Sequence, residues 1–210
     1  MALDWATKKT TFTNKLKVSS FGRVGNITSG VDAITTNHTK ITYVDCGAKE
    51  VGIAENVLGP TCSVSMSDGG TKIWGLPWEK SFAGRTQLGA GGSSIFLTPS
   101  LNGCCVMISG TTVQPVVVHA NCQPTALLTP VSDNQPLYFR LWSDVYVTVA
   151  SQLVAKGHIP DTNLELLQPT DYMLAGVSDA SVFGVRAGSN WSFYVVVNRA
   201  AGGTTRKIWG

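Results

Sequence analysis

Residues 102–121 read NGCCVMISGTTVQPVVVHAN, and this stretch decides the predicted fold. Two short apolar runs, rich in valine and isoleucine, flank a Gly/Thr turn, which is the pattern of a β-hairpin. A turn centred on residues 111–112 places Cys104 directly opposite His119, with their Cβ atoms about 5 Å apart. Because side chains alternate between the two faces of a strand, Cys105 points the other way. The predicted hairpin therefore brings one thiol and one imidazole together on one face.

A thiol and an imidazole at this distance can form a nucleophilic site. Only the thiolate is a good nucleophile, and an imidazole can hold it as an ion pair and later return the proton to a leaving amine. The site also needs a group that orients the ring, for which Thr98 is the candidate, and N–H donors for an oxyanion, for which the loop 99–103 is the candidate. In that loop, Gly103 lets the backbone approach a substrate and Asn102 adds a side-chain amide. A β-bulge at Pro115 would shift the register and undo the choice of thiol.

The residues around this pair resemble the Leu-Ser-Gly-Cys … His motif of the bacterial toxin glutamine deamidases, a family that includes the cytotoxic necrotizing factor catalytic domain and Burkholderia lethal factor. The matching blocks are Phe96-Leu97-Thr98, Leu101-Asn102-Gly103-Cys104 and His119. A further block, Ile73-Trp74-Gly75-Leu76-Pro77-Trp78, is similar to a Trp-Leu-Pro-Trp stretch of the lethal factor. The resemblance covers residues 72–121, roughly a quarter of the chain.

The resemblance implies that Cys104 is the nucleophile, His119 the general base and Thr98 the support of the imidazole. It also implies that Leu101 and the two residues after it bind the oxyanion or the substrate. Asn102 stands where the family motif has serine, and the cysteine–histidine gap matches the necrotizing factor better than the lethal factor. Both departures bear on the substrate, and neither removes a part that the chemistry requires.

The function that the resemblance implies is that of a secreted toxin or effector, made in the bacterial cytoplasm and acting in the host cytosol. It would convert one glutamine of a host regulatory protein to glutamate through a thioester, with no metal or cofactor. A translation-initiation helicase is the favoured target and a Rho-family GTPase the second. A cysteine peptidase or a transglutaminase-like acyl transferase uses the same dyad and stays open. So does a non-catalytic, β-rich binding module, because free cysteines are often core residues.

The composition predicts one folded domain over residues 1–210. Hydrophobic residues make up 43% and charged residues 14%, which argues against disorder. The net charge of +3 is too small to indicate a nucleic-acid partner. Five cysteines at irregular spacing do not form a disulfide framework, and we expect free thiols. No signal peptide or membrane-spanning run is apparent, so we expect no membrane contact. We also expect a monomer. A zinc site is disfavoured because adjacent cysteines in a strand are poor ligands.

Short valine-rich runs predict an α+β fold, with β-sandwich-like mixed sheets, a few short helices and long loops. The aromatic residues Trp74 and Trp78 either line a substrate cleft or pack in the core. A short helix is predicted at 161–167, and glycine-rich loops at 89–92 and 201–203, with a mobile tail after Arg199. Strands are predicted at 40–45, 93–98, 104–109, 115–120, 144–150 and 192–198.

Overall fold

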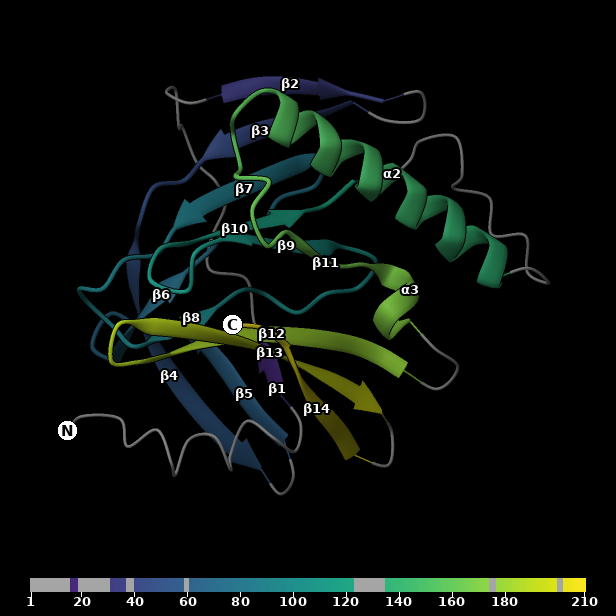
Figure 1. Cartoon of the computed structure of the whole chain (residues 1–210). Coiled ribbons are helices and arrows are strands. Elements are labelled where there is room, and N and C mark those ends of the chain that lie inside the picture. Colours follow the sequence, from purple (N-terminus) through teal and green to yellow (C-terminus); the bar gives the residue numbers. More distant parts are fainter. Residues whose placement is uncertain are drawn as a thin grey trace.

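The structure, a computed structural model, describes residues 16–18, 31–36, 40–58, 61–122, 135–173, 177–199 and 202–210. The N-terminal segment in which a signal peptide was sought lies outside these residues. Two mixed β-sheets lie one above the other, and helix α2 crosses the outer face of the upper sheet (Figure 1). The predicted α+β, β-rich fold with mixed sheets is confirmed.

The upper sheet has six strands in the order β11-β9-β10-β7-β3-β2. Only the β3–β7 pair is parallel among its five pairings. This sheet carries the hairpin, which is formed by β9 and β10. Its strands are β2 (Val31–Thr35), β3 (Lys40–Asp45), β7 (Phe82–Gln87), β9 (Cys105–Gly110), β10 (Pro115–Ala120) and β11 (Glu165–Leu167).

The lower sheet has eight strands in the order β1-β5-β4-β6-β8-β12-β13-β14. It curls back on itself, because Asn198 of β13 hydrogen bonds both backbone groups of Leu16 in β1. Its first four strands along the chain are β1 (Leu16–Val18), β4 (Glu50–Leu58), β5 (Thr61–Met66) and β6 (Thr71–Gly75). The others are β8 (Ile95–Leu97), β12 (Val177–Ala187), β13 (Asn190–Arg199) and β14 (Gly202–Trp209).

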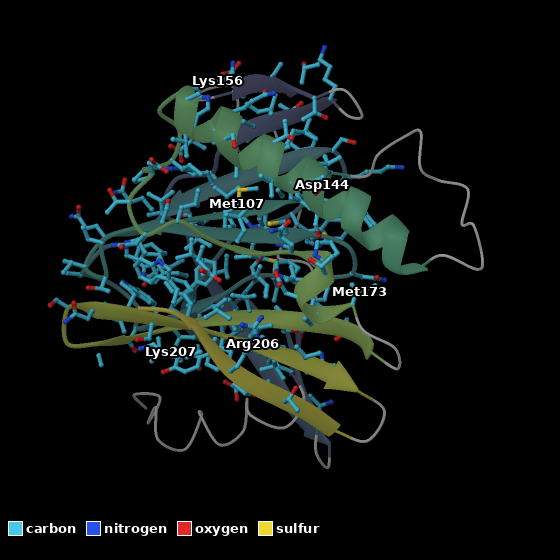
Figure 2. The ribbon with its side chains drawn as sticks, turned by 45° about the vertical axis from the view of Figure 1, so that its right-hand side comes forward. Met107, Asp144, Lys156, Met173, Arg206 and Lys207 are labelled. Atoms are coloured by element: carbon cyan, nitrogen blue, oxygen red, sulfur yellow. The ribbon has the colours of Figure 1, made fainter. Side chains whose placement is uncertain are left out.

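The hairpin has an apolar core on each of its faces. On the outer face, side chains such as Met107 and Val118 pack against α2 (Gln135–Ala155), and Met107 lies beneath this helix in Figure 2. On the inner face, Val106 and Val117 pack against the lower sheet. Each strand therefore alternates between two buried environments, which explains why β9 and β10 are buried throughout and mostly apolar.

Helix α2 contradicts the strand predicted at 144–150. Valine alternates with other residues there, which resembles a strand, but the buried positions follow the helical period instead. Val147 is 48% exposed although it belongs to the same valine series. Valines thus occupy both the buried and the exposed face, and this concealed the 3.6-residue period. The buried side chains of the helix are Trp142, Ser143, Val145, Tyr146, Val149, Ala150 and Leu153.

Two other local predictions are wrong. The segment 161–167 is not a helix, because Glu165–Leu167 forms β11 on the open edge of β9. Seven residues are too few for a helix without tertiary support, and strand pairing decides the conformation. The segment predicted as a glycine loop and mobile tail contributes β14, which pairs with β13. The only short helix described in this part of the chain is α3 (Pro169–Tyr172).

The predicted hairpin register is also wrong. The first pair of the ladder is Gly110 with Pro115, so the turn has four residues rather than two. His119 therefore pairs with Val106, and Cys104 lies just before β9 instead of directly opposite His119. The observed register differs from the predicted one by two residues, and an offset of two leaves every side chain on the same face. Cys104, and not Cys105, therefore lies on the histidine's face of the hairpin.

Candidate active site

His119 is buried on the inner face of the hairpin and is held by one hydroxyl. Its side chain is 1% exposed and that of Thr98 is fully buried. The Thr98 Oγ1 lies 2.5 Å from the His119 Nδ1. Thr98 follows β8 of the lower sheet, so the contact joins the two sheets at this point. The structure thus brings together the predicted base and the residue predicted to orient it.

The hydrogen bonds of Thr98 are compatible with the tautomer of the imidazole that a general base needs. The Thr98 hydroxyl donates to the Leu76 carbonyl oxygen at 3.4 Å. A hydroxyl has one proton, so in this arrangement it accepts from a protonated Nδ1 of His119. The Nε2 then carries the lone pair, and it is buried without a hydrogen-bond partner among the described residues. This unpartnered nitrogen is able to accept a proton.

Cys104 lies within the core of this face, and the half-buried Cys46 packs against the same core. The Cys104 side chain is 5% exposed and packs with the inner-face core, whereas Cys105 is fully buried in the outer-face core. Cys104 is a diagonal neighbour of His119, because it stands two residues before Val106. Diagonal neighbours have Cβ atoms roughly 7–8 Å apart, which is too far for a hydrogen bond between the two side chains at rest. The two groups would approach further during a reaction.

Burial keeps both groups neutral at rest. It raises the pKa of the Cys104 thiol to about 12, and the backbone N–H of Asn102 opposes this shift. Burial also lowers the pKa of His119 to about 3. The expected thiolate–imidazolium pair is therefore replaced by a neutral thiol beside a neutral imidazole. Such a pair can still react if the imidazole removes the proton while the sulfur attacks.

The segment after β6 closes over His119. The Trp78 ring stacks on the imidazole with a centroid distance of 6.4 Å and an interplanar angle of 19°. Trp78 and Pro77 are only half-buried, so they extend from the histidine toward the surface. Gly84 pairs with His119 on the neighbouring strand, and a Cβ there would lie 3.3 Å from the Pro77 carbonyl oxygen. The missing side chain leaves room for this segment.

The loop residues predicted to bind an oxyanion or substrate have different surroundings. Leu101 is fully buried, and its backbone N–H and carbonyl both pair with Ala180, so it anchors the loop. Asn102 is exposed at the tip. The Gly103 N–H donates to the Tyr172 hydroxyl at 3.1 Å and is occupied. Of these three residues, Asn102 has the exposed side chain that a substrate could meet.

Two tyrosines and a tryptophan at this site were not found by sequence reasoning. The hydroxyls of Tyr146 and Tyr172 hydrogen bond the backbone around Cys104. The Trp142 ring packs against Gly103, where a Cβ would lie 2.3 Å from a ring carbon. Gly103 has φ +88°, a conformation that favours glycine. Tyr146 and Tyr172 are 43 and 69 residues from Gly103 in sequence, and no spacing pattern connects them to the loop.

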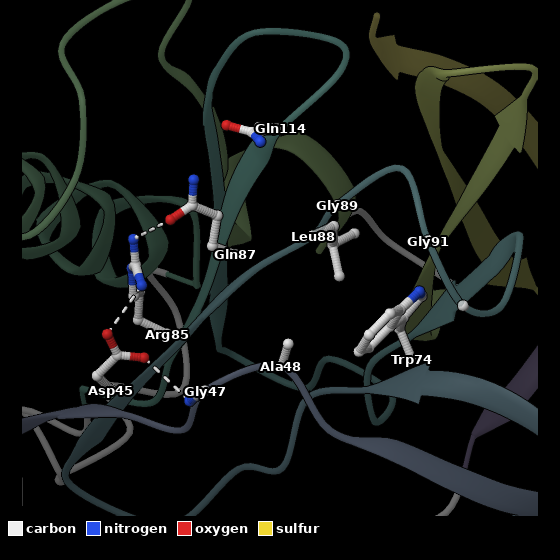
Figure 3. Close-up of a pocket in the computed structure, with 11 residues that line it drawn as sticks. Asp45, Gly47, Ala48, Trp74, Arg85, Gln87, Leu88, Gly89, Gly91 and Gln114 are labelled. Atoms are coloured by element: carbon white, nitrogen blue, oxygen red, sulfur yellow. Dashed lines mark hydrogen bonds and ion pairs between the residues drawn. The ribbon is translucent and has the colours of Figure 1, made fainter.

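A separate cavity of about 790 Å³ lies at the turn end of the hairpin (Figure 3). Arg85 forms an ion pair with Asp45 at 2.8 Å and donates to Gln87 on one side, and Trp74 stands on the other. Neither member of the predicted dyad lines it. Of the two tryptophans considered as cleft residues, Trp74 therefore belongs to this cavity and Trp78 to the histidine.

Neither the comparison with protein-family models nor that with curated proteins gives a match. Among the described residues, no three His, Cys, Asp or Glu side chains gather as a metal-binding group. The described helices are also too short or too polar to cross a membrane.

Proposed function

We propose that this chain is a cysteine-dependent protein glutamine deamidase, with Cys104 as nucleophile and His119 as general base. One observation carries the proposal: a buried imidazole has one nitrogen held by Thr98 and the other without a hydrogen-bond partner among the described residues, on the face that also holds a thiol. A buried polar atom without a partner costs about 1–3 kcal/mol, so a core histidine serving stability alone is an unfavourable choice. A catalytic role for His119 would account for this energetic cost.

The reaction begins with the neutral pair. The His119 Nε2 removes the thiol proton as the Cys104 sulfur attacks the side-chain amide carbon of a glutamine, forming a tetrahedral oxyanion. The C–N bond then breaks, and ammonia leaves with the proton from His119. A water molecule, deprotonated by the same nitrogen, attacks the thioester. The C–S bond breaks, the thiol regains its proton, and the glutamine has become glutamate.

The half-buried Trp78 and the exposed Asn102 are the two residues through which a substrate would reach the site. Trp78 lies against His119 and Asn102 is two residues before Cys104, so they flank the dyad. The preference for deamidation over peptide cleavage rests on the motif resemblance.

The resemblance to the toxin deamidases supports the biological part of the proposal. The chain would act as a toxin on a host protein in the cytosol, on a translation-initiation helicase first and on a Rho-family GTPase second. The block from Ile73 to Trp78 favours the helicase, and Trp78 of that block is the residue stacked on His119.

The test is intact-mass and peptide-mapping analysis of the helicase and of the GTPase after incubation with the wild type, Cys104→Ser or Cys105→Ser. We expect one glutamine to become glutamate without chain cleavage, with the wild type and Cys105→Ser only. Cleavage of the target would instead establish a peptidase. No change in either target, together with a Cys104 thiol that resists every electrophile, would contradict the proposal and leave a binding module.

A further inference from the structure

The hairpin ladder is interrupted by a tyrosine hydroxyl beside Cys104. The last paired residues are Cys105 and Ala120, and continuing the register would pair Gly103 with Cys122. The Tyr146 hydroxyl stands between these two residues instead. It accepts from the Cys122 N–H at 3.2 Å and donates to the Gly103 carbonyl oxygen at 2.7 Å. A side chain of α2 thereby fixes the peptide unit that joins Gly103 to Cys104.

A second tyrosine fixes the two adjoining peptide units. The Tyr172 hydroxyl accepts from the Gly103 N–H at 3.1 Å and donates to the Cys104 carbonyl oxygen at 2.6 Å. Both tyrosines are fully buried. Each hydroxyl thus acts once as acceptor and once as donor. The two hydroxyls together hold three consecutive peptide units around Cys104. Tyr146 holds the central unit, and Tyr172 holds the unit on each side of it.

The orientation of the central peptide unit follows from its carbonyl. The described chain has no cis peptide bond, so the carbonyl of Gly103 and the N–H of Cys104 point in opposite directions. Tyr146 draws the carbonyl toward α2 and the end of β10. The Cys104 N–H therefore points away from β10, the strand that carries His119. The Gly103 N–H is already occupied by Tyr172.

We propose that the backbone N–H of Cys104 is the oxyanion donor of this site and that Tyr146 is the positioning residue that aims it. The inference rests on the proposed function and places the donor at Cys104 instead of in the loop 99–103, where it was expected from the sequence. With the base on one side of the sulfur and the donor on the other, a carbonyl carbon attacked by the sulfur would have its oxygen beside the N–H. Gly103 then serves by its positive φ and its close contact with Trp142.

The experiment compares two reactions of the same thiol in the intact protein. Acylation of Cys104 by p-nitrophenyl acetate passes through a tetrahedral oxyanion and releases p-nitrophenolate. Alkylation by iodoacetamide displaces iodide and forms no oxyanion. Mass spectrometry of the Cys104 peptide gives both rates, and their ratio measures oxyanion stabilisation separately from access and thiol basicity. The ratio would not respond to a merely structural role.

Tyr146→Phe is the test variant and Tyr172→Phe its matched control, because each removes one buried hydroxyl with two backbone hydrogen bonds. We expect both to lower the thermal midpoint to a similar extent. Tyr146→Phe should lower the acylation-to-alkylation ratio about tenfold or more, whereas Tyr172→Phe should change it less than about threefold.

Each contrary result has a separate meaning. An unchanged ratio in Tyr146→Phe, or equal losses of ratio in both variants, would overturn the assignment of Tyr146. A wild type whose Cys104 is alkylated but not acylated would overturn the N–H donor itself. A wild type whose Cys104 reacts with neither reagent would contradict the proposed function, because the thiol would then not be a nucleophile.

Discussion

The two faces of the β9–β10 hairpin are equally buried but differ in chemistry. The outer face meets α2 through residues such as Val118 and Cys105, and it resembles an ordinary hydrophobic core. The inner face meets the lower sheet and includes His119, whose Nε2 has no partner in the described residues. Burial alone therefore does not separate the faces. The difference lies in one polar group that is oriented but left incompletely satisfied.

This difference shows what a stable core tolerates. The buried tyrosine hydroxyls around Cys104 each have a donor and an acceptor, as buried polar groups should. The imidazole of His119 has one hydrogen-bond partner in the part of the chain that the structure describes, although it is no more exposed. The unsatisfied nitrogen in such well-packed surroundings supports the proposed function.

Among the substitutions on the two faces of the hairpin, replacing the inner-face thiol should reduce activity most. Cys104→Ser should reduce deamidation about a thousandfold or more, because a hydroxyl is much less acidic than a thiol and His119 cannot make it an effective nucleophile. The thermal midpoint should fall no further than in Cys105→Ser, because both changes bury one hydroxyl in an apolar core. Single-turnover assays with thermal melts would measure both. Full activity in Cys104→Ser would remove the functional distinction between the faces.

Replacing the base should have the next largest effect. His119→Gln keeps a group that can hydrogen bond Thr98 but removes the proton acceptor, and turnover should fall about 10²- to 10⁴-fold. His158→Gln is the matched control, since His158 stacks on Tyr43 and contacts Asp32 on the outer side of the upper sheet. The control should retain wild-type turnover. Equal losses in the two variants would indicate a general structural effect.

Thr98→Val should lower turnover about 10- to 100-fold, less than either dyad variant. Valine has the shape of threonine but cannot hydrogen bond the His119 Nδ1, so the ring loses its fixed tautomer and orientation. Thr98→Ser keeps the hydroxyl and should remain within a fewfold of wild type. Single-turnover rates at equal thermal midpoints make the comparison. If valine and serine behave alike, another group orients the ring.

The smallest effect on activity is expected from the outer face. Cys105→Ser should leave turnover within about twofold of wild type and lower the free energy of unfolding by about 1–3 kcal/mol, because it buries a hydroxyl against α2. Chemical denaturation and a turnover assay measure the two quantities. An inactive but stable Cys105→Ser would reverse the assignment of the faces.

The sequence predicted the face of the active thiol better than its exact position. Strand periodicity depends only on whether a residue number is odd or even, so Cys104 and His119 share a face in either register. The register itself depends on the length of the turn, and a Gly/Thr segment fits two or four residues. Thr98 was predicted because the imidazole requires an orienting group and because the motif resemblance points to the same residue; periodicity played no part.

Long-range contacts were the part that sequence could not provide. Tyr146 lies in a segment whose alternating valines favour a strand, and its role depends on the helix that packs on the hairpin. The pKa values of the dyad likewise follow from burial by both sheets, which local sequence does not contain. A thiolate–imidazolium pair is reasonable for a solvent-exposed site, but burial of Cys104 and His119 makes the neutral forms dominant.

The pH profile of Cys104 alkylation tests the central claim most directly. Neutral His119 and neutral Cys104 are the dominant forms between their pKa values of about 3 and about 12. With His119 as the base, the alkylation rate should therefore be nearly constant from pH 5 to pH 8. In His119→Gln the thiolate alone reacts, and the rate should rise about tenfold per pH unit. Site-resolved mass spectrometry separates Cys104 from the half-buried Cys46. Parallel profiles for wild type and His119→Gln, each rising with pH, would contradict the claim that His119 activates Cys104.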